Sequence, residues 1–113
     1  MGPEALERAA LALPAATLSI QWGDERVYKV GGKMFAWTDG ACSRLSLKAT
    51  ELAFEVLVET GIARPSPYLA RAKWLRFDDV AVLDDAETAD WLRTSHGLVA
   101  AKLTRAQRRA LGL

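Results

Sequence analysis

The residues best suited to chemistry in this sequence are aromatic rings separated by cations and hydroxyls between positions 17 and 48. The dipeptide Gly31-Gly32 predicts a two-residue β-hairpin turn, and counting outward from it places every second residue on one face of a sheet. Exposed rings can stack on nucleobases, and nearby cations can bind phosphates. We therefore predict a nucleic-acid-binding face made of Arg26, Tyr28, Lys33, Phe35, Trp37, Arg44 and Lys48.

The same face has two other interpretations. Phe35 and Trp37 could form a second small core beneath the loop from 62 to 72, with Tyr68 packed on them and cations at the rim. Alternatively, the face could bind a protein partner or a second copy of the chain. A nucleic-acid site requires exposed, unpaired cations, whereas a protein interface more often buries the rings and pairs the cations with acids. The sequence leaves these alternatives open.

Catalytic and metal-binding patterns are weak. His96 is the only histidine and Cys42 the only cysteine, and no motif brings the two together. Helix capping and loop solubility explain the acidic pairs Asp78-Asp79 and Asp84-Asp85. Gly31-Gly32-Lys33 lacks the rest of a Walker pattern. We therefore expect a binding module rather than an enzyme, with no metal and no cofactor.

An antiparallel sheet must position the predicted binding face. Turn signals at Gly23-Asp24, Gly31-Gly32 and 38–41 divide residues 17–48 into a four-stranded meander. The second face of this meander is apolar, and helices should cover it. Its members are Leu18, Ile20, Trp22, Val27, Met34, Ala36, Leu45 and Leu47, with Lys29 the one interruption.

Turn lengths determine the predicted register. We assume loops of four residues on either side of the two-residue turn, the second of them over 39–42. A bulge of one residue would change part of the assignment. The resulting pairs include Ser19 with Tyr28, Tyr28 with Phe35, Arg26 with Trp37, Trp37 with Arg44, and Lys33 with Lys48.

Helices and one further strand complete the expected fold. Capping residues and prolines mark the helix ends, and the second helix should cover the apolar face of the sheet. The expected fold class is α+β, with an antiparallel sheet of about five strands packed on one face by helices. We expect helices from Pro3 to Pro14, from Thr50 to Gly61 and from Asp84 past Gly97, a short terminal turn capped by Thr104, and a strand over 73–77.

Size and composition are those of an ordinary globular protein. With 113 residues and a net charge of +1, residues 1–113 should form a single domain, without the overall basicity of a histone-type protein. No apolar run is long enough to span a membrane, and the N-terminus lacks a signal-peptide pattern. We therefore expect a cytoplasmic protein with no membrane partner.

Charge is unevenly distributed along the chain. Residues 78–90 contain six acids and no base, whereas Arg71, Lys73 and Arg76 just before them and the C-terminal region are basic. Near the C-terminus, Lys102, Arg105 and Arg109 share one helical stripe. That stripe could bind phosphates, or it could simply solvate the end of the helix.

Several short motifs occur together and in order. They are Leu13-Pro14, Trp22-Gly23-Asp24, Val30-Gly31-Gly32-Lys33-Met34-Phe35-Ala36, Leu45-Ser46-Leu47-Lys48, Pro65-Ser66-Pro67-Tyr68-Leu69, Ser95-His96-Gly97-Leu98-Val99 and Ala101-Lys102-Leu103. In this combination the chain closely resembles the MmcQ/YjbR family, although His96 stands where the family usually has tyrosine. The resemblance implies an α+β fold and a proposed DNA-binding mode called a double wing. The wings would be the loops at Gly23-Asp24 and 39–42.

Overall fold

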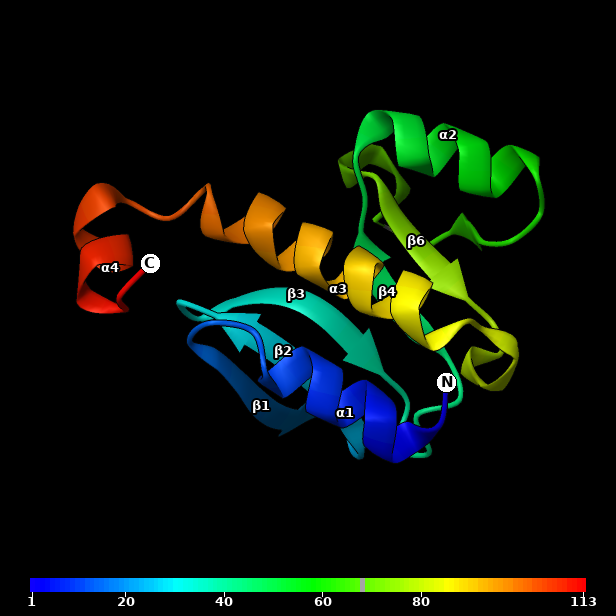
Figure 1. Ribbon diagram of the computed structural model, residues 1–113, viewed down its shortest axis with the longest axis horizontal. Coiled ribbons are helices and arrows are strands. Elements are labelled where there is room, and N and C mark those ends of the chain that lie inside the picture. Colours follow the sequence, from blue (N-terminus) through cyan, green and yellow to red (C-terminus); the bar gives the residue numbers. More distant parts are fainter. Residues whose placement is uncertain (68) are drawn as a thin grey trace.

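Six strands form one antiparallel sheet in the order β1-β2-β3-β4-β6-β5 (Figure 1). The computed structural model describes residues 1–67 and 69–113. The strands are β1 (Ala16–Gln21), β2 (Glu25–Val30), β3 (Lys33–Thr38), β4 (Leu45–Lys48), β5 (Arg64–Pro65) and β6 (Trp74–Phe77). The helices are α1 (Pro3–Leu11), α2 (Glu51–Glu59), α3 (Asp85–Ala100) and α4 (Arg105–Ala110), with 3₁₀ turns η1 (Ala70–Ala72) and η2 (Val80–Val82).

The α+β class is confirmed, with six strands rather than about five. The additional strand, β5, is only two residues long and pairs with β6 at the edge of the sheet. Proline has no amide hydrogen to donate to a neighbouring strand, so an edge position suits Pro65. Because this segment contains prolines, the sequence predicts a loop over 62–72 rather than a strand.

Local capping signals place the helices correctly. The Thr50 side chain accepts a hydrogen bond from the amide of Ala53, and Asp84 accepts one from the amide of Glu87 at 2.9 Å. Thr104 and Gln107 form a reciprocal capping box at the start of α4. Each of these bonds satisfies an amide that has no partner within the helix. The predicted helix starts are therefore confirmed.

The predicted register is wrong beyond the first pairs of the central hairpin. Val30 pairs with Lys33 as predicted, but a β-bulge then gives β3 an extra residue, so Tyr28 pairs with Ala36 instead of Phe35. The β1–β2 loop has three residues instead of four, which pairs Leu18, not Ser19, with Tyr28. Because side chains alternate across a strand, each one-residue shift exchanges the two faces of the sheet.

The β3–β4 loop is also longer than predicted. It contains six residues, 39–44, so Trp37 pairs with Ser46 rather than Arg44. The ladder between these strands ends at the Ala36–Leu47 pair. The predicted pairing of Lys33 with Lys48 is therefore wrong as well.

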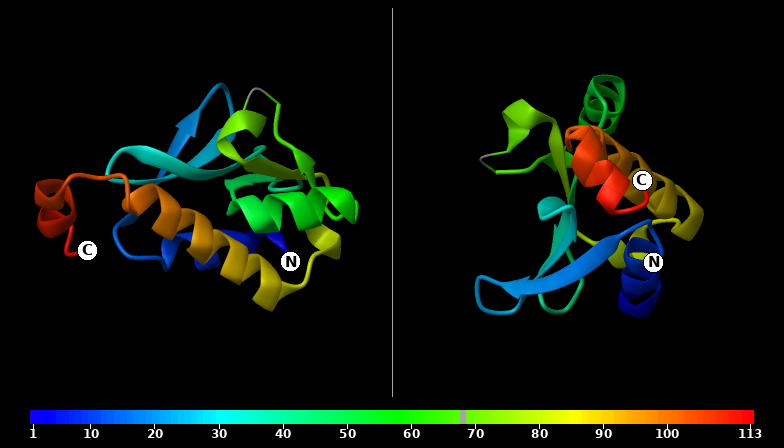
Figure 2. Two further views of the ribbon diagram at one scale, coloured as in Figure 1. Left: turned by 90° about the horizontal axis from the view of Figure 1, so that it is seen from above. Right: turned by 90° about the vertical axis from the view of Figure 1, so that its left-hand side faces the viewer.

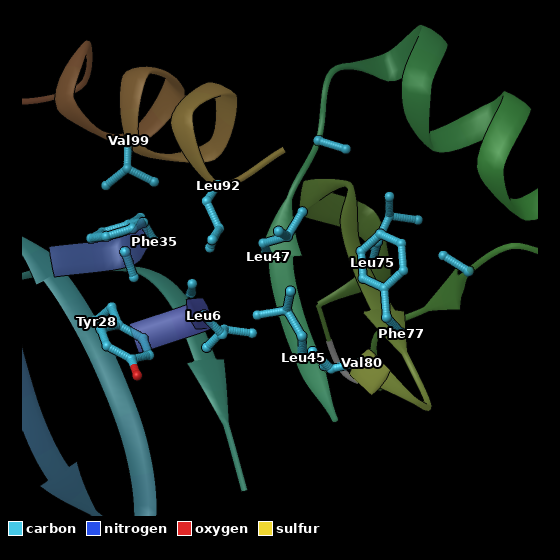
Figure 3. Packing of buried hydrophobic residues seen from close by; sticks show 14 of the residues in the cluster. Leu6, Tyr28, Phe35, Leu45, Leu47, Leu75, Phe77, Val80, Leu92 and Val99 are labelled. Carbon is cyan, nitrogen blue, oxygen red and sulfur yellow. The ribbon is translucent and has the colours of Figure 1, made fainter. Parts of the chain in front are cut away.

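A single hydrophobic core lies between one face of the sheet and the helices α1 and α3 (Figures 1 and 3). Of the apolar face predicted from the sequence, Ala36, Leu45 and Leu47 are buried there, whereas Val27 lies on the opposite face and Trp22 is 65% exposed. The core also contains residues that were not predicted to lie on the apolar face, among them Leu6, Tyr28, Phe35, Leu75, Phe77, Leu92 and Val99.

Helix α2 does not cover the sheet as predicted. It packs against β5 and β6 at one edge, and only Leu57 of this helix is buried, whereas the apolar residues Leu52 and Val56 are exposed. Figure 1 shows α2 at the edge of the sheet and α3 across its centre. The 16-residue α3 already occupies the apolar face together with α1, so no central position remains for α2.

The opposite face of the sheet is partly covered by the segment around η1. Ser66 donates its amide to the carbonyl of Trp74, and its hydroxyl bonds that of Ser46 at 3.3 Å. Figure 2 shows this segment rising from the sheet on the side away from α3. Val27 and Trp74 are buried on this face. The predicted contact of Tyr68 with this region lies outside the described residues.

Candidate nucleic-acid interface

The structure does not bring the seven predicted binding residues onto one face. Tyr28 and Phe35 are completely buried in the core beneath the helices. The Phe35 ring lies edge-on to the His96 imidazole, with 5.2 Å between ring centroids. Neither ring is available to stack on a base. The bulge is the reason, because it turns Phe35 toward the helices and moves Tyr28 to the same side.

Two of the predicted cations are paired with acids. Arg26 lies on the helix side of the sheet and forms a salt bridge with Glu7 of α1. Arg44 lies in the β3–β4 loop, 4.0 Å from the Asp39 carboxylate. Burial opposes ionisation of Asp39, but hydrogen bonds from Ser43 and Arg44 outweigh it and hold the pKa of Asp39 below its ordinary value. Both cations therefore contribute to local structure.

The two loops predicted as wings do lie together at one end of the sheet. Gly40 approaches the Asp24 carboxylate so closely that a Cβ at position 40 would collide with it. Burial, followed by the charges of Asp24 and Asp39, raises the pKa of Glu25. The loops thus concentrate carboxylates, which repel phosphate groups. Asp78 and Asp79 lie beside the β3–β4 loop, because Val80 donates its amide to the Ser43 carbonyl, and two arginines pair with Asp78. We call Asp24, Glu25, Asp39, Asp78 and Asp79 the acidic end.

Trp37 belongs to this acidic end rather than to a basic surface. It is half-buried on the sheet face opposite the helices. Its ring meets that of Trp22 edge to face, with 6.3 Å between centroids. In the sheet Trp37 pairs with Ser46, and Ser46 pairs in turn with Arg76, which is bonded to Asp78.

The β2–β3 turn and the α3–α4 corner lie together at the other end of the molecule (Figure 1). Cations are concentrated in these segments and in α4. Among the described residues, the side-chain salt bridges involve only Arg26, Arg44, Arg64, Arg76 and Arg93. The cations of this cluster therefore have no acidic group of the described residues within ion-pair distance. We call this cluster the basic end; its members are Lys33, Lys102, Arg105, Arg108 and Arg109.

One glycine makes the basic end compact. Gly31 adopts a left-handed conformation with φ of 58°, and a Cβ there would lie 2.7 Å from Leu103. The turn therefore packs directly on Leu103, which is buried at the junction of α3 and α4. This contact brings the turn that carries Lys33 beside the corner that carries Lys102, 69 positions later in the sequence.

Lys48 adjoins the basic end but is less available than Lys33. Its ammonium group donates to the Ala72 carbonyl at 2.7 Å. Burial and the nearby charge of Lys102 lower the pKa of Lys48. Of the seven residues predicted from the sequence, Lys33 is thus the one exposed, unpaired cation at this end, and Lys48 lies near Lys102.

Comparison with known proteins assigns the chain to a family. Residues 11–98 match the family model described as YjbR. The chain belongs to the YjbR family. The crystal structure of Deinococcus radiodurans protein DR2400, with the domain DUF419, resembles this YjbR protein with a TM-score of 0.86 and 27% identity. The similarity covers 99% of this chain and 88% of that chain. No curated protein matches.

The YjbR motif around Ser95 has a structural role that sequence reasoning missed. The Ser95 hydroxyl donates to the Phe35 carbonyl at 2.5 Å and accepts from the Lys48 amide at 2.9 Å. It therefore links β3 to β4 where their ladder ends. Beside it, His96 is hydrogen-bonded through Nε2 to the Pro14 carbonyl at 2.7 Å. In the sequence, only the family motif that contains Ser95 and His96 drew attention to these two positions, and the pattern of apolar residues did not.

Cys42 and His96 occupy separate environments. Cys42 is buried in the β3–β4 loop, where the Thr38 hydroxyl donates to its sulfur at 3.6 Å. His96 lies on α3 beside Pro14. The described residues contain no group of three or more His, Cys, Asp or Glu that could hold a metal ion. None of the described helices combines the length and hydropathy needed to cross a bilayer.

Proposed function

We propose that this YjbR-family protein is a nucleic-acid-binding module that contacts phosphates through its basic end. The observation that carries the proposal is the gathering of five unpaired cations from three segments at one end, opposite the carboxylates of the acidic end. Exposed cations bind phosphates and release condensed counterions, which is the main source of sequence-independent affinity. The resulting dipole would orient the protein as it approaches a polyanion.

This proposal differs from the base-stacking face predicted from the sequence. The aromatic rings are either buried or located at the acidic end, so they do not support base recognition. Phosphate contacts position a protein on nucleic acid but carry no direct sequence information. We therefore propose that binding has only a weak sequence preference, and duplex DNA is the first ligand to test. The separate, structural bonding of Cys42 and His96 supports binding without a chemical step.

The test replaces Lys33 and Lys102 together by alanine. Binding to a random duplex oligonucleotide pool is followed by fluorescence anisotropy over a range of salt concentrations. Loss of two phosphate contacts should lower the slope of log affinity against log salt by about 1.8, at roughly 0.9 per contact. The matched control is Arg8→Ala with Arg93→Ala, which removes the same charge from other sites.

Two outcomes would overturn the proposal. One is a parent protein that does not bind above background at low salt. The other is an equal loss of affinity in the control, because the effect would then reflect net charge alone rather than the basic end. Circular dichroism of both double variants should match the parent, since all four side chains are exposed or lie at the surface.

A further inference from the structure

An apolar groove lies at the end of the molecule opposite α4. It has a volume of about 430 Å³ and lies between the end of α2, β5 and η2. Two of its side chains are unusually exposed for their type: Ile62 is 50% exposed and Val82 is 77% exposed. The apolar lining consists of Val58, Ile62, Ala63, Phe77, Val82 and Leu83.

The charged residues that line or adjoin this groove carry a small excess of negative charge, because Arg64 also lines it beside Asp78 and Asp79. Asp78 lies at the rim with Arg64 and Arg76 paired to it, and Asp79 also lines the groove. Glu59 and Asp84, both exposed, directly follow lining residues in the sequence. An occupant with apolar side chains and several positive charges would therefore suit both the floor and the rim.

The C-terminal segment 104–113 has this chemistry. No residue of α4, which the structure describes throughout, is buried. Leu111 and Leu113 are exposed, and Arg105, Arg108 and Arg109 surround a hollow that Leu113 also lines. Positive and apolar side chains thus share one side of the segment. The segment cannot reach its own groove, because the two lie at opposite ends of a molecule 39 Å long (Figure 1).

We propose that segment 104–113 of one copy docks in the apolar groove of a second copy, and that the exchange is reciprocal. Two copies placed antiparallel bring each tail to the other's groove, which makes two identical contacts related by a two-fold axis. This inference goes beyond nucleic-acid binding and does not depend on it. Because Arg105, Arg108 and Arg109 belong both to the basic end and to the tail, polyanion binding and dimerisation compete for the tail.

The experiment uses two complementary variants of the full chain. Ile62→Asp with Val82→Asp blocks the groove, and Leu111→Ser with Leu113→Ser weakens the tail; all four side chains are exposed, so folding should survive. Sedimentation equilibrium over a range of concentrations should show a dimer for the parent and monomers for each variant. An equimolar mixture of the two variants should recover a dimer, with one contact instead of two.

Two further measurements locate the contact. In the mixture, the ¹⁵N-labelled tail variant should show amide shift changes at Ile62 and Val82 when the unlabelled groove variant is added. Leu52→Asp with Val56→Asp places the same two negative charges on exposed apolar residues that are absent from the groove lining, and it should leave association unchanged. Lys33→Ala with Lys102→Ala should weaken DNA binding and leave the dimer intact.

The proposal is overturned by a parent that stays monomeric at the highest concentration. It is also overturned if both blocked variants dimerise like the parent, because the contact then lies elsewhere, such as on the sheet face. A mixture that remains monomeric would show that groove and tail do not bind each other. None of these results depends on whether the parent binds DNA.

Discussion

Replacing Ser95 by alanine would remove the hydroxyl that links α3 to the two central strands. The side chain is completely buried, and it donates to the Phe35 carbonyl while accepting from the Lys48 amide. These two strands have no ladder pairing beyond Ala36 and Leu47, so neither backbone group has an adjacent strand to replace the lost bond. The substitution therefore leaves one donor and one acceptor without partners.

The expected cost follows from those two groups. A buried polar group left without a partner costs about 1–3 kcal/mol, and the Phe35 carbonyl is the more deeply buried of the two. We expect Ser95→Ala to lower the free energy of unfolding by about 2–4 kcal/mol. Alanine has the higher helix propensity, which would raise stability by a few tenths of a kcal/mol and cannot account for a loss.

Urea unfolding followed by tryptophan fluorescence measures this difference. The denaturation midpoint should fall while the dependence on urea concentration stays constant. Thr94→Ala is the matched control, because it removes an exposed hydroxyl from the preceding position of the same helix, and its effect should be within about 0.5 kcal/mol. A loss below 0.5 kcal/mol for Ser95→Ala would refute the bridging role of the hydroxyl.

Two further predictions concern the turn and the acidic end. Gly31→Ala should destabilise the protein by about 1–3 kcal/mol, because it combines a left-handed backbone with a collision against Leu103. Gly32→Ala shares the backbone strain, but its Cβ would meet no described atom within 4 Å, so thermal unfolding should show a smaller loss. Glu25→Gln should raise the melting temperature at pH 7, because the raised pKa of Glu25 means that the folded state favours its protonated form. The advantage should vanish below the ordinary pKa of 4.5 and grow as the pH rises through the folded value; a difference independent of pH would contradict this reasoning.

The sequence alone determined the features that depend on neighbouring residues. Capping side chains such as Thr50 and Asp84 placed the helix starts, since they bond amides only three positions away. The Gly31-Gly32 turn was identified because a tight hairpin needs left-handed backbone at both positions. The ordered motifs also identified the family, which the match over residues 11–98 confirms.

Only the tertiary structure decided which side chains share a surface. Side chains alternate along a strand, so one extra residue at the bulge and one fewer in the β1–β2 loop were enough to bury Tyr28. No local signal distinguishes a loop of three residues from one of four when both contain Gly23-Asp24. The position of α2 was equally hidden, because its apolar residues fit either a central or an edge location.

The basic end could not be assembled from the sequence for a related reason. The segments that carry Lys33 and Lys102 adjoin because the turn packs on Leu103, a contact between distant segments that required the folded chain. Whether a cation is free also depends on tertiary neighbours: Arg26 meets Glu7 of α1, whereas the arginines of α4 meet no described acid. The sequence supplied the charges, and the packing of distant segments decided which of them neutralise each other and which remain free to bind a partner.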